Sequence, residues 1–575
     1  MATFPRRGFV AEIVCLVVLV TVGLCVSLPC FRSEIEFEDE GCLAYGAVRV
    51  MEGQIPNRDF VSLQPPLCYY AAAATFKLIG TSLLSLRILG LGVYLAMPLL
   101  IYGISRQFNG RSISLAAALP ATILGLPYFN FVPFAVWQGN AVALMAVLAY
   151  LLALRTGAWA GWAWAAGCLT ATTMLLRQDH GFYLLIALGV LSGVLRFARG
   201  QVPAGGKPAA ACLNRLLLAW LAGTGLILLP WGLFWTVERA WPDVLRQLVL
   251  FPATTYAKTS SLPFPDLRAA LAWGPQIINL LFFAPPLLDL LVAIWLGQRL
   301  VRHRAGHREA LVTFLLVWSS LFYCQVLVRS DLKHVLITLP PFFILAGCAF
   351  RWGLNSALHC MTAGAAEAAS DRSSASLKRA GDETRGPKRS ETARPPAAKD
   401  PGQQPGAETT LINRFVQRRN LAGAGICCLS AGLVSVFLWL AAQECLPPRL
   451  GPADALKLKR GGLRVRGSAD LQVYIEGLQN LAPSNRSILC LPYQPMLYFL
   501  CERRNPTRWN YIWPGDQTPE ELQALVEQAR RDPPALVVLN HEEVLRNYAP
   551  AVIDYIQRDY LLAAKTKGRL LYLPR

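Results

Sequence analysis

The chain has few charged residues, and it lacks the cysteine patterns of structural zinc sites. Asp, Glu, Lys and Arg make up 16% of its 575 residues, whereas soluble proteins average about 25%. No Cys-x-x-Cys pair or Cys/His zinc spacing occurs among its 15 cysteines, which argues against a structural metal site. Most of these cysteines lie within apolar runs, where they behave as small hydrophobic residues.

The chain is instead rich in long apolar segments. Hydrophobic residues make up 54% of it, and runs of about 20 apolar residues, enough to cross a bilayer, recur throughout. The first, Phe9–Leu28, could be a signal peptide, but it is long for one and no small-residue cleavage site ends it. Leu67–Ile79 is apolar but short, which suits a re-entrant or interfacial helix. We expect eleven spans, near residues 8–28, 84–105, 113–132, 139–155, 158–176, 181–198, 215–236, 277–298, 309–328, 334–350 and 421–442.

The basic residues predict how these spans are oriented. The formal net charge is +19, but the basic residues form short clusters between apolar runs, which argues against nucleic acid as a partner. Basic loops stay on the cytoplasmic side of a membrane, so we expect a multi-pass protein of the inner (plasma) membrane with a cytoplasmic N-terminus. The clusters that set this orientation are Arg106 and Arg111, Arg155, Arg196–Arg215, Arg299–Arg308 and the stretch 351–419.

Composition then divides the chain into domains. We expect an all-α polytopic membrane domain at 1–350, whose first extracytoplasmic loop is 30–83. Residues 351–420 are rich in Ala, Ser, Pro, Gly and mixed charge, and such a segment cannot bury a core. They are expected to be a disordered basic cytoplasmic linker, followed by the last span at 421–442.

Residues 443–575 are expected to form a small periplasmic (extracytoplasmic) α/β domain. The pattern predicts strands at 487–491, 535–539 and 569–573, and amphipathic helices at 519–530 and 542–557. Neither GxGxxG nor GxxxxGK[ST] occurs in it, so no nucleotide site is expected. Cys490 and Cys501 could form a disulfide in an oxidising compartment.

The first outside loop carries a dense acidic cluster. Five of the seven residues from Glu34 to Glu40 are carboxylates, and such crowding raises pKa values or recruits a cation. The loop continues through Tyr45, Gly53, Pro65-Pro66 and Tyr69-Tyr70, and then through Leu83–Arg87. This order and spacing resemble the first periplasmic loop of GT-C glycosyltransferases, in particular the protein O-mannosyltransferase and aminoarabinose-transferase superfamily.

The resemblance implies a GT-C fold and an inverting transfer of a sugar from a polyprenyl-phosphate donor to a glycan, lipid or protein acceptor. It implies that Asp39 is the catalytic base and Glu40 the adjoining acid of the pair, and it implies no required cofactor. One position departs from the pattern. Where aminoarabinose transferases have a Lys before a single Pro, this chain has Gln64 before two, so the donor phosphate must be neutralised elsewhere.

Two other outside turns offer cations for that phosphate. Each turn combines an Arg, an Asp and a His near the edge of a span, where charge is costly unless it is paired or used. The planar guanidinium of Arg suits phosphate oxygens; simple anchoring at the membrane interface is the alternative. The residues are Arg177, Asp179 and His180 in one turn, and Arg329, Asp331 and His334 in the other.

Three further residues are candidate substrate contacts: Tyr69 in the first loop, and Tyr256 and Lys258 in the loop 237–276. Each could equally be an interface anchor. A divalent metal is possible on oxygen and nitrogen ligands, with Asp39, Asp179, His180, Asp331 and His334 as the set.

Two other kinds of protein remain open. A transporter or flippase for a lipid-linked or glycan substrate would show repeats and broken spans near mid-membrane, whereas the polar residues here gather at one face. A scaffold or sensor that binds through its C-terminal domain is the other alternative.

Overall fold

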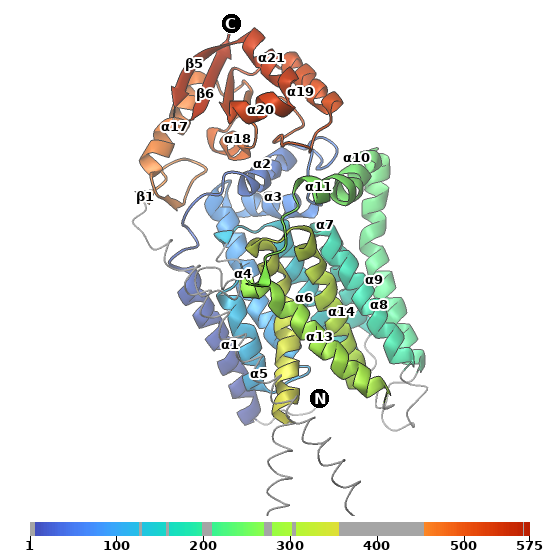
Figure 1. Ribbon diagram of the computed structural model, residues 1–575. Helices are drawn as coiled ribbons and strands as arrows, with labels where there is room; N and C mark the ends of the chain where they lie inside the picture. Colours follow the sequence, from blue (N-terminus) through green and yellow to red (C-terminus); the bar gives the residue numbers. More distant parts are fainter. Residues whose placement is uncertain are drawn as a thin grey trace, which may run out of the picture. The chain divides into compact units, whose positions relative to one another are not determined.

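The computed structural model describes residues 6–125, 129–156, 160–197, 210–268, 279–301, 306–355, 454–566 and 568–575. Long apolar helices dominate its first 355 residues and run alongside one another (Figure 1). Eight helices of the described part are long and apolar enough to cross a membrane. They are α1 (Arg6–Ser27), α4 (Leu83–Ser105), α6 (Ala135–Thr156), α8 (Gln178–Phe197), α9 (Ala210–Val237), α13 (Leu280–Val301), α14 (His307–Val328) and Leu332–Asn355.

The predicted membrane domain is therefore confirmed, although the number of eleven spans is not. Helix α7 (Ala160–Leu176) has 17 residues, at the lower end of the length that spans a bilayer. The predicted linker 351–420 is described only as far as Asn355, within the helix Leu332–Asn355. The rest of that linker and the predicted span at 421–442 lie outside the described residues.

The span predicted at 113–132 is wrong as a continuous helix. Helix α5 (Arg111–Ala118) gives way to a 3₁₀ turn, η1 (Leu119–Thr122), where Pro120 cannot donate the next helical hydrogen bond. The chain from Phe131 onward then packs directly on α4 at Gly90, where a Cβ would lie 1.8 Å from the Phe131 carbonyl oxygen. Glycine at that position permits the close approach of the two backbones.

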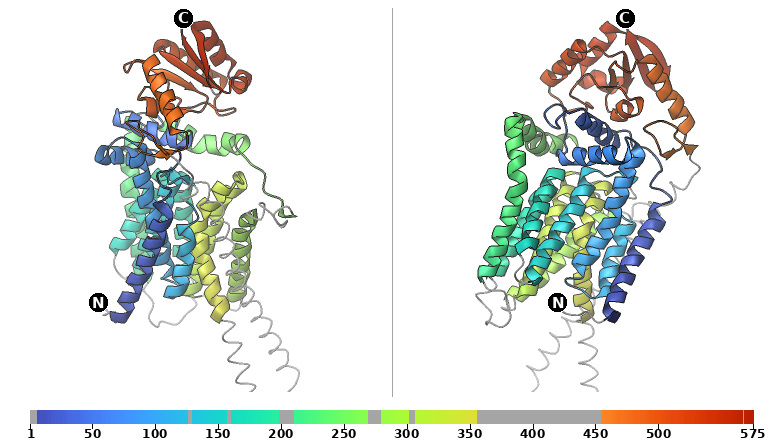
Figure 2. Two further views of the ribbon diagram at one scale, coloured as in Figure 1. Left: turned by 90° about the vertical axis from the view of Figure 1, so that its left-hand side faces the viewer. Right: turned by 180° about the vertical axis from the view of Figure 1, so that it is seen from behind.

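Two short helices follow α1, and Figure 2 shows them across one end of the long helices. Helix α2 (Asp39–Met51) has two carboxylates in its first turn and Arg49 in its last, an arrangement that complements the helix dipole. Helix α3 (Leu67–Ile79) begins after Pro66. Its 13 residues reach only about 20 Å, too short for a span, as its length predicted.

A second short helical segment connects α9 to the next long helices. It comprises α10 (Trp241–Leu245), η4 (Arg246–Leu250), η5 (Pro252–Tyr256) and α11 (Ala257–Thr259), of which η4 and η5 are π-helical. π-Helical turns are rare and frequently occur at functional sites. Tyr256, a candidate from the sequence, is the last residue of η5.

Residues 454–575 form a smaller region with a four-stranded sheet. Its strand order is β3-β4-β6-β5, with β3 and β4 parallel and the other pairs antiparallel. The strands are β3 (Ile488–Leu491), β4 (Leu536–Asn540), β5 (Tyr560–Thr566) and β6 (Arg569–Pro574); the two-residue strands β1 (Asp454–Ala455) and β2 (Arg464–Val465) pair separately. The helices are α17 (Ser468–Leu481), α18 (Pro495–Cys501), α19 (Pro519–Arg531), α20 (Glu542–Tyr548) and α21 (Pro550–Asp559).

The predicted small α/β domain is confirmed, and its three predicted strands and helix 519–530 are present. Two details differ. The helix predicted at 542–557 is two helices, because Pro550 begins α21 and cannot continue α20. Strand β5, which is largely exposed, was not anticipated.

The apolar core of this region continues into the first loop of the chain. Buried side chains of α2 and α3 belong to the same cluster as those of β3 and α18. Tyr45 stacks on Tyr498 with ring centroids 4.9 Å apart, and Phe76 stacks on Phe499 at 5.7 Å. The C-terminal sheet region is thus packed on the segment that carries the acidic cluster.

Candidate active site

The acidic cluster is held in place by a buried ion pair. Arg87, in the first turns of α4, donates from Nε and Nη2 to the two carboxylate oxygens of Glu40, both at 2.8 Å. Neither side chain has any exposed surface. Arg87 also donates to the Glu34 carbonyl oxygen at 3.0 Å. Glu40 therefore fixes the loop to α4, and this burial favours a positioning role over the catalytic role expected for it.

Reciprocal hydrogen bonds shape the turn that precedes α2. The Glu40 amide donates to the Glu36 carboxylate at 2.6 Å, and the Glu36 amide donates to the Glu40 carboxylate at 3.1 Å. Burial and the neighbouring Asp39 charge raise the pKa of Glu36 to about 7. A proton on this carboxyl at neutral pH relieves the repulsion within the cluster.

Asp39 is one of two exposed carboxylates of the cluster. Its Oδ1 accepts a hydrogen bond of 2.7 Å from the hydroxyl of Tyr493, which comes from the C-terminal sheet region. The other exposed carboxylate is Glu38. Burial and the Asp39 charge raise the pKa of Glu38, while Lys333 and His541 act in the opposite direction. Lys333, at the start of the helix Leu332–Asn355, thus lies within electrostatic range of the acidic cluster.

The two Arg-containing turns both lie within electrostatic range of Tyr256. Arg177 binds Asp179 through Nε at 2.8 Å and Nη2 at 3.1 Å. Burial acts to lower the pKa of the Arg177 guanidinium, but Asp179, with Tyr256 and Tyr183, raises it above its usual value. Burial also acts to lower the pKa of Arg329, and Tyr256 and Asp331 raise it.

The second turn is tied together by its own aspartate. Asp331 accepts from Nε of Arg329 at 2.9 Å and contacts Nδ1 of His334 at 2.7 Å. Burial acts to raise the pKa of Asp331, but these cations lower it to about 2. The Asp331 charge is therefore retained at all physiological pH values, and it holds the Arg329 side chain in a fixed direction.

His180 differs from the other candidates because it is fully buried. Its ring stacks on Phe322 with centroids 4.5 Å apart. Gly139 allows α6 to approach His180 and Arg177 closely, since a Cβ there would lie 2.9 Å from Cβ of Arg177 and 3.8 Å from Nδ1 of His180. Neither ring nitrogen has a hydrogen-bond partner among the described residues.

The remaining candidates divide between structural and exposed positions. Tyr69 is buried, donates to or accepts from the Ser62 hydroxyl at 2.8 Å, and packs on Gly46 of α2. Gln64 lies in the turn before α3, where its backbone N–H donates to Ser62 Oγ at 3.0 Å. Lys258, in α11, is exposed. Tyr69 and Gln64 thus shape the loop, and Lys258 is accessible to a ligand.

The five-residue metal set is not assembled. Within the ranges that the structure describes, no group of three or more His, Cys, Asp or Glu side chains is placed to hold a metal ion. Asp179 and Asp331 are instead engaged by the Arg of their own turns.

Comparison with known proteins tests the fold independently. No protein-family model matches the chain, and no curated protein matches it in sequence. Two solved structures match over almost the full length of both chains. The ArnT of Cupriavidus metallidurans bound to undecaprenyl phosphate aligns at 14% identity with a TM-score of 0.53, covering 99% of this chain and 98% of that one. The apo form of the same ArnT aligns at 14% identity with a TM-score of 0.54 and 98% of both chains covered.

The chain has a GT-C fold. The sequence resemblance is therefore confirmed at the level of the fold. Because the coverage is nearly complete, the GT-C likeness extends beyond the membrane helices to the C-terminal sheet region, whereas the sequence motif covered only the membrane domain. At 14% identity the likeness concerns the fold alone.

The site of this GT-C fold includes residues that sequence reasoning did not select. Arg87 is the last residue of the matched motif, so the sequence marked its position. The sequence did not indicate that Arg87 binds Glu40. Tyr493 and its stacked neighbour Tyr511 lie about 450 residues from Asp39 in the chain, and no spacing rule joins residues so far apart. Lys333 lies between Asp331 and His334 in the sequence, but no substrate-binding role was assigned to it.

Proposed function

We propose that the chain is a membrane glycosyltransferase that moves a sugar from a polyprenyl-phosphate donor to an acceptor outside the cytoplasm, in the inner membrane. The observation that supports this most directly is the setting of Asp39. It is an exposed carboxylate that is hydrogen-bonded to Tyr493, its neighbour Glu40 is bound to Arg87, and the fold is shared with an ArnT that was crystallised with undecaprenyl phosphate.

Asp39 would act as the general base. As the acceptor attacks, Asp39 takes the proton from its hydroxyl or amine, a bond forms between the acceptor atom and the anomeric carbon, and the bond from that carbon to the phosphate oxygen breaks. The polyprenyl phosphate leaves with the electron pair. A single displacement of this kind inverts the anomeric centre. A base must reach the acceptor proton at hydrogen-bond distance, which an exposed carboxylate on a short helix permits.

Arg177, Arg329 and Lys333 would neutralise the donor phosphate. Asp331 binds Arg329 through Nε, so the Nη groups of the guanidinium are not engaged by that carboxylate. Tyr256 lies within electrostatic range of both arginines. Planar guanidinium groups bind phosphate oxygens in pairs, and Lys adds a mobile charge. These three cations support recognition of the donor phosphate even though position 64 is Gln and not Lys.

The experiment compares wild type with Asp39→Asn in proteoliposomes, supplied with undecaprenyl-phosphate-linked [¹⁴C]hexoses and an envelope fraction as the acceptor source. Release of undecaprenyl phosphate and transfer of label are measured by chromatography. Loss of the base should lower the rate roughly 10²–10⁴-fold. Glu52→Gln, at the far exposed end of α2, is the matched control and should keep full activity. Transfer that persists in Asp39→Asn would refute the role of the base.

A further inference from the structure

The C-terminal sheet region contributes one side chain directly to the candidate base. Tyr493 follows β3 and precedes α18, and its hydroxyl donates to Oδ1 of Asp39 at 2.7 Å. Among the described residues no other side chain hydrogen-bonds to this carboxylate. The bond therefore decides which way the carboxylate of Asp39 is turned.

The Tyr493 ring is itself held in place. It stacks on Tyr511 with centroids 4.2 Å apart and planes inclined by 24°. It also makes an edge-to-face contact with Trp513, with ring centroids 6.2 Å apart. Stacked rings of this kind resist rotation of the side chain. The segment that carries Tyr493 is bounded by β3 and α18, whose residues are all buried.

The backbone that follows Tyr493 is also held against the helix that carries Asp39. Met496, at the start of α18, donates its amide to the Phe37 carbonyl oxygen at 3.3 Å. Gly41 of α2 lies so close that a Cβ there would be 2.4 Å from the Met496 nitrogen. The backbone N–H of Asn505 donates to the Tyr45 hydroxyl at 2.7 Å. Helices α2 and α18 are thus in backbone contact within one helical turn of Asp39.

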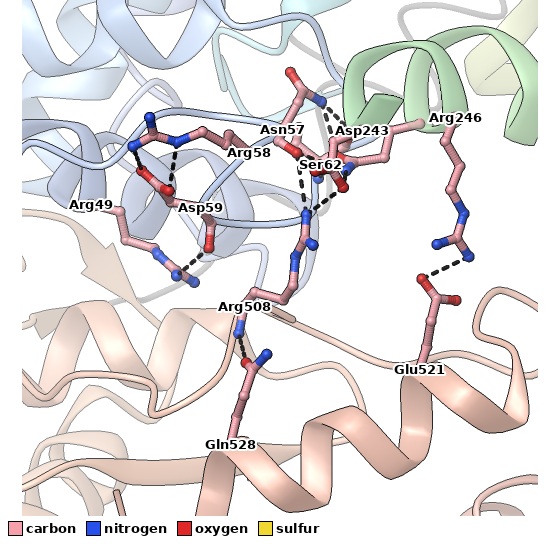
Figure 3. A network of polar contacts seen from close by, with 11 residues as sticks. Arg49, Asn57, Arg58, Asp59, Ser62, Asp243, Arg246, Arg508, Glu521 and Gln528 are labelled. Atoms are coloured by element: carbon pink, nitrogen blue, oxygen red, sulfur yellow. Dashed lines mark hydrogen bonds and ion pairs between the residues drawn. The ribbon is translucent and has the colours of Figure 1, made fainter. Parts of the chain in front are cut away.

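Polar contacts further from Asp39 hold the same two parts together (Figure 3). Arg49, at the end of α2, donates to Oδ1 of Asn510 in the C-terminal region at 2.8 Å. It also donates to the Asp59 carbonyl oxygen of the first loop at 3.2 Å. Arg508 binds Asp243 of α10 at 2.7 Å. The relation of Tyr493 to Asp39 therefore rests on contacts at both ends of α2.

We propose that Tyr493 is the positioning residue of the base, so that the C-terminal region completes the active site instead of only covering it. The proposal rests on the proposed function. The phenol holds Oδ1, which leaves Oδ2 directed to the acceptor.

The test is Tyr493→Phe in the full-length protein, with the same donors and envelope fraction as above. Phenylalanine keeps the stacked ring and removes only the hydroxyl. We expect kcat to fall about tenfold while KM for the donor and KM for the acceptor stay the same, because the hydroxyl orients the base and does not bind a substrate. Tyr555→Phe is the matched control, because it removes a hydroxyl from the same region whose contacts are with Ala529 and Tyr560; its kcat should equal that of wild type.

A second variant guards against an effect on folding. Tyr511→Leu removes the stacked partner and keeps the Tyr493 hydroxyl, so it should lower kcat by a smaller factor. Thermal unfolding of each variant shows whether it is folded. An unchanged kcat in Tyr493→Phe overturns the positioning role, and so does a change confined to the acceptor KM. If wild type transfers no sugar or Asp39→Asn remains active, the proposed function itself has failed.

Discussion

At the scale of single residues, the main result is that two adjacent carboxylates have opposite environments. Successive residues of a helix point about 100° apart, so the first turn of α2 directs Glu40 inward to Arg87 and leaves Asp39 at the surface beside Tyr493. The sequence motif marks both as an acidic pair. Their separate roles, one as an anchor and the other as the candidate base, follow from burial.

The buried pair makes a prediction about stability. Arg87→Met leaves the Glu40 carboxylate buried without its partner, which should lower the free energy of unfolding by roughly 3–5 kcal/mol. Thermal unfolding in detergent measures the change. Lys459→Met is the control, because Lys459 is 79% exposed in its pair with Glu502 and exposed pairs contribute less than about 1 kcal/mol. Equal effects in the two variants would contradict this account.

Glu36 predicts how stability depends on pH. Its pKa in the folded protein is about 7, against an ordinary value of 4.5, so between these values the folded state binds more protons than the unfolded state. Its stabilising contribution is therefore complete below pH 4.5 and is lost as pH rises through 7. Unfolding midpoints of wild type and Glu36→Gln, measured from pH 5 to 8, should differ in slope, with the variant showing the weaker decline. Parallel curves would show that Glu36 does not titrate in this range.

At the scale of elements, local signals predicted three strands of the four-stranded C-terminal sheet, because β3, β4 and β6 each have a short, continuous apolar run. Proline accounts for both misplaced helices. Pro120 ends the helical part of the predicted span at 113–132, and Pro550 divides the predicted helix 542–557. In both cases the apolar pattern continued through a residue that cannot complete the helical hydrogen bonds.

The contact between α2 and α18 depends on a glycine. Gly41→Ala would place a Cβ 2.4 Å from the Met496 backbone nitrogen, and a backbone atom cannot move aside as a side chain can. We expect α18 to separate from α2, with faster proteolysis of the C-terminal region and reduced transfer activity. The control is Gly477→Ala in α17, which has no atom within 4 Å of the added Cβ and should stabilise that helix by roughly 0.5–1 kcal/mol.

At the scale of the whole molecule, the C-terminal region shares a core with the acidic loop and is joined to the segment α10–α11 by ion pairs. Arg508 binds Asp243, and Arg246 binds Glu521, so each side contributes both charges. Such crossed pairs specify one orientation of the C-terminal region.

A double-mutant cycle on Arg508→Met and Asp243→Asn tests this connection. Because both side chains are about 30% exposed, we expect a coupling energy of roughly 0.5–1 kcal/mol, measured from the rate at which a protease releases the C-terminal region. The same cycle on Arg558 and Asp559, a more exposed pair within that region, should leave release unchanged. Additive effects at Arg508 and Asp243 would show that the pair does not hold the region in place.

The sequence alone determined the membrane character, the α/β nature of the C-terminal region, the acidic loop and the GT-C resemblance. These depend on composition, on local periodicity and on a motif whose parts lie close together in the chain. Tertiary structure decided the rest: that Glu40 is bound to Arg87 and that Tyr493 reaches Asp39. Each contact joins residues separated by tens to hundreds of positions, and only the packing of helices and sheet brings such residues within hydrogen-bond distance.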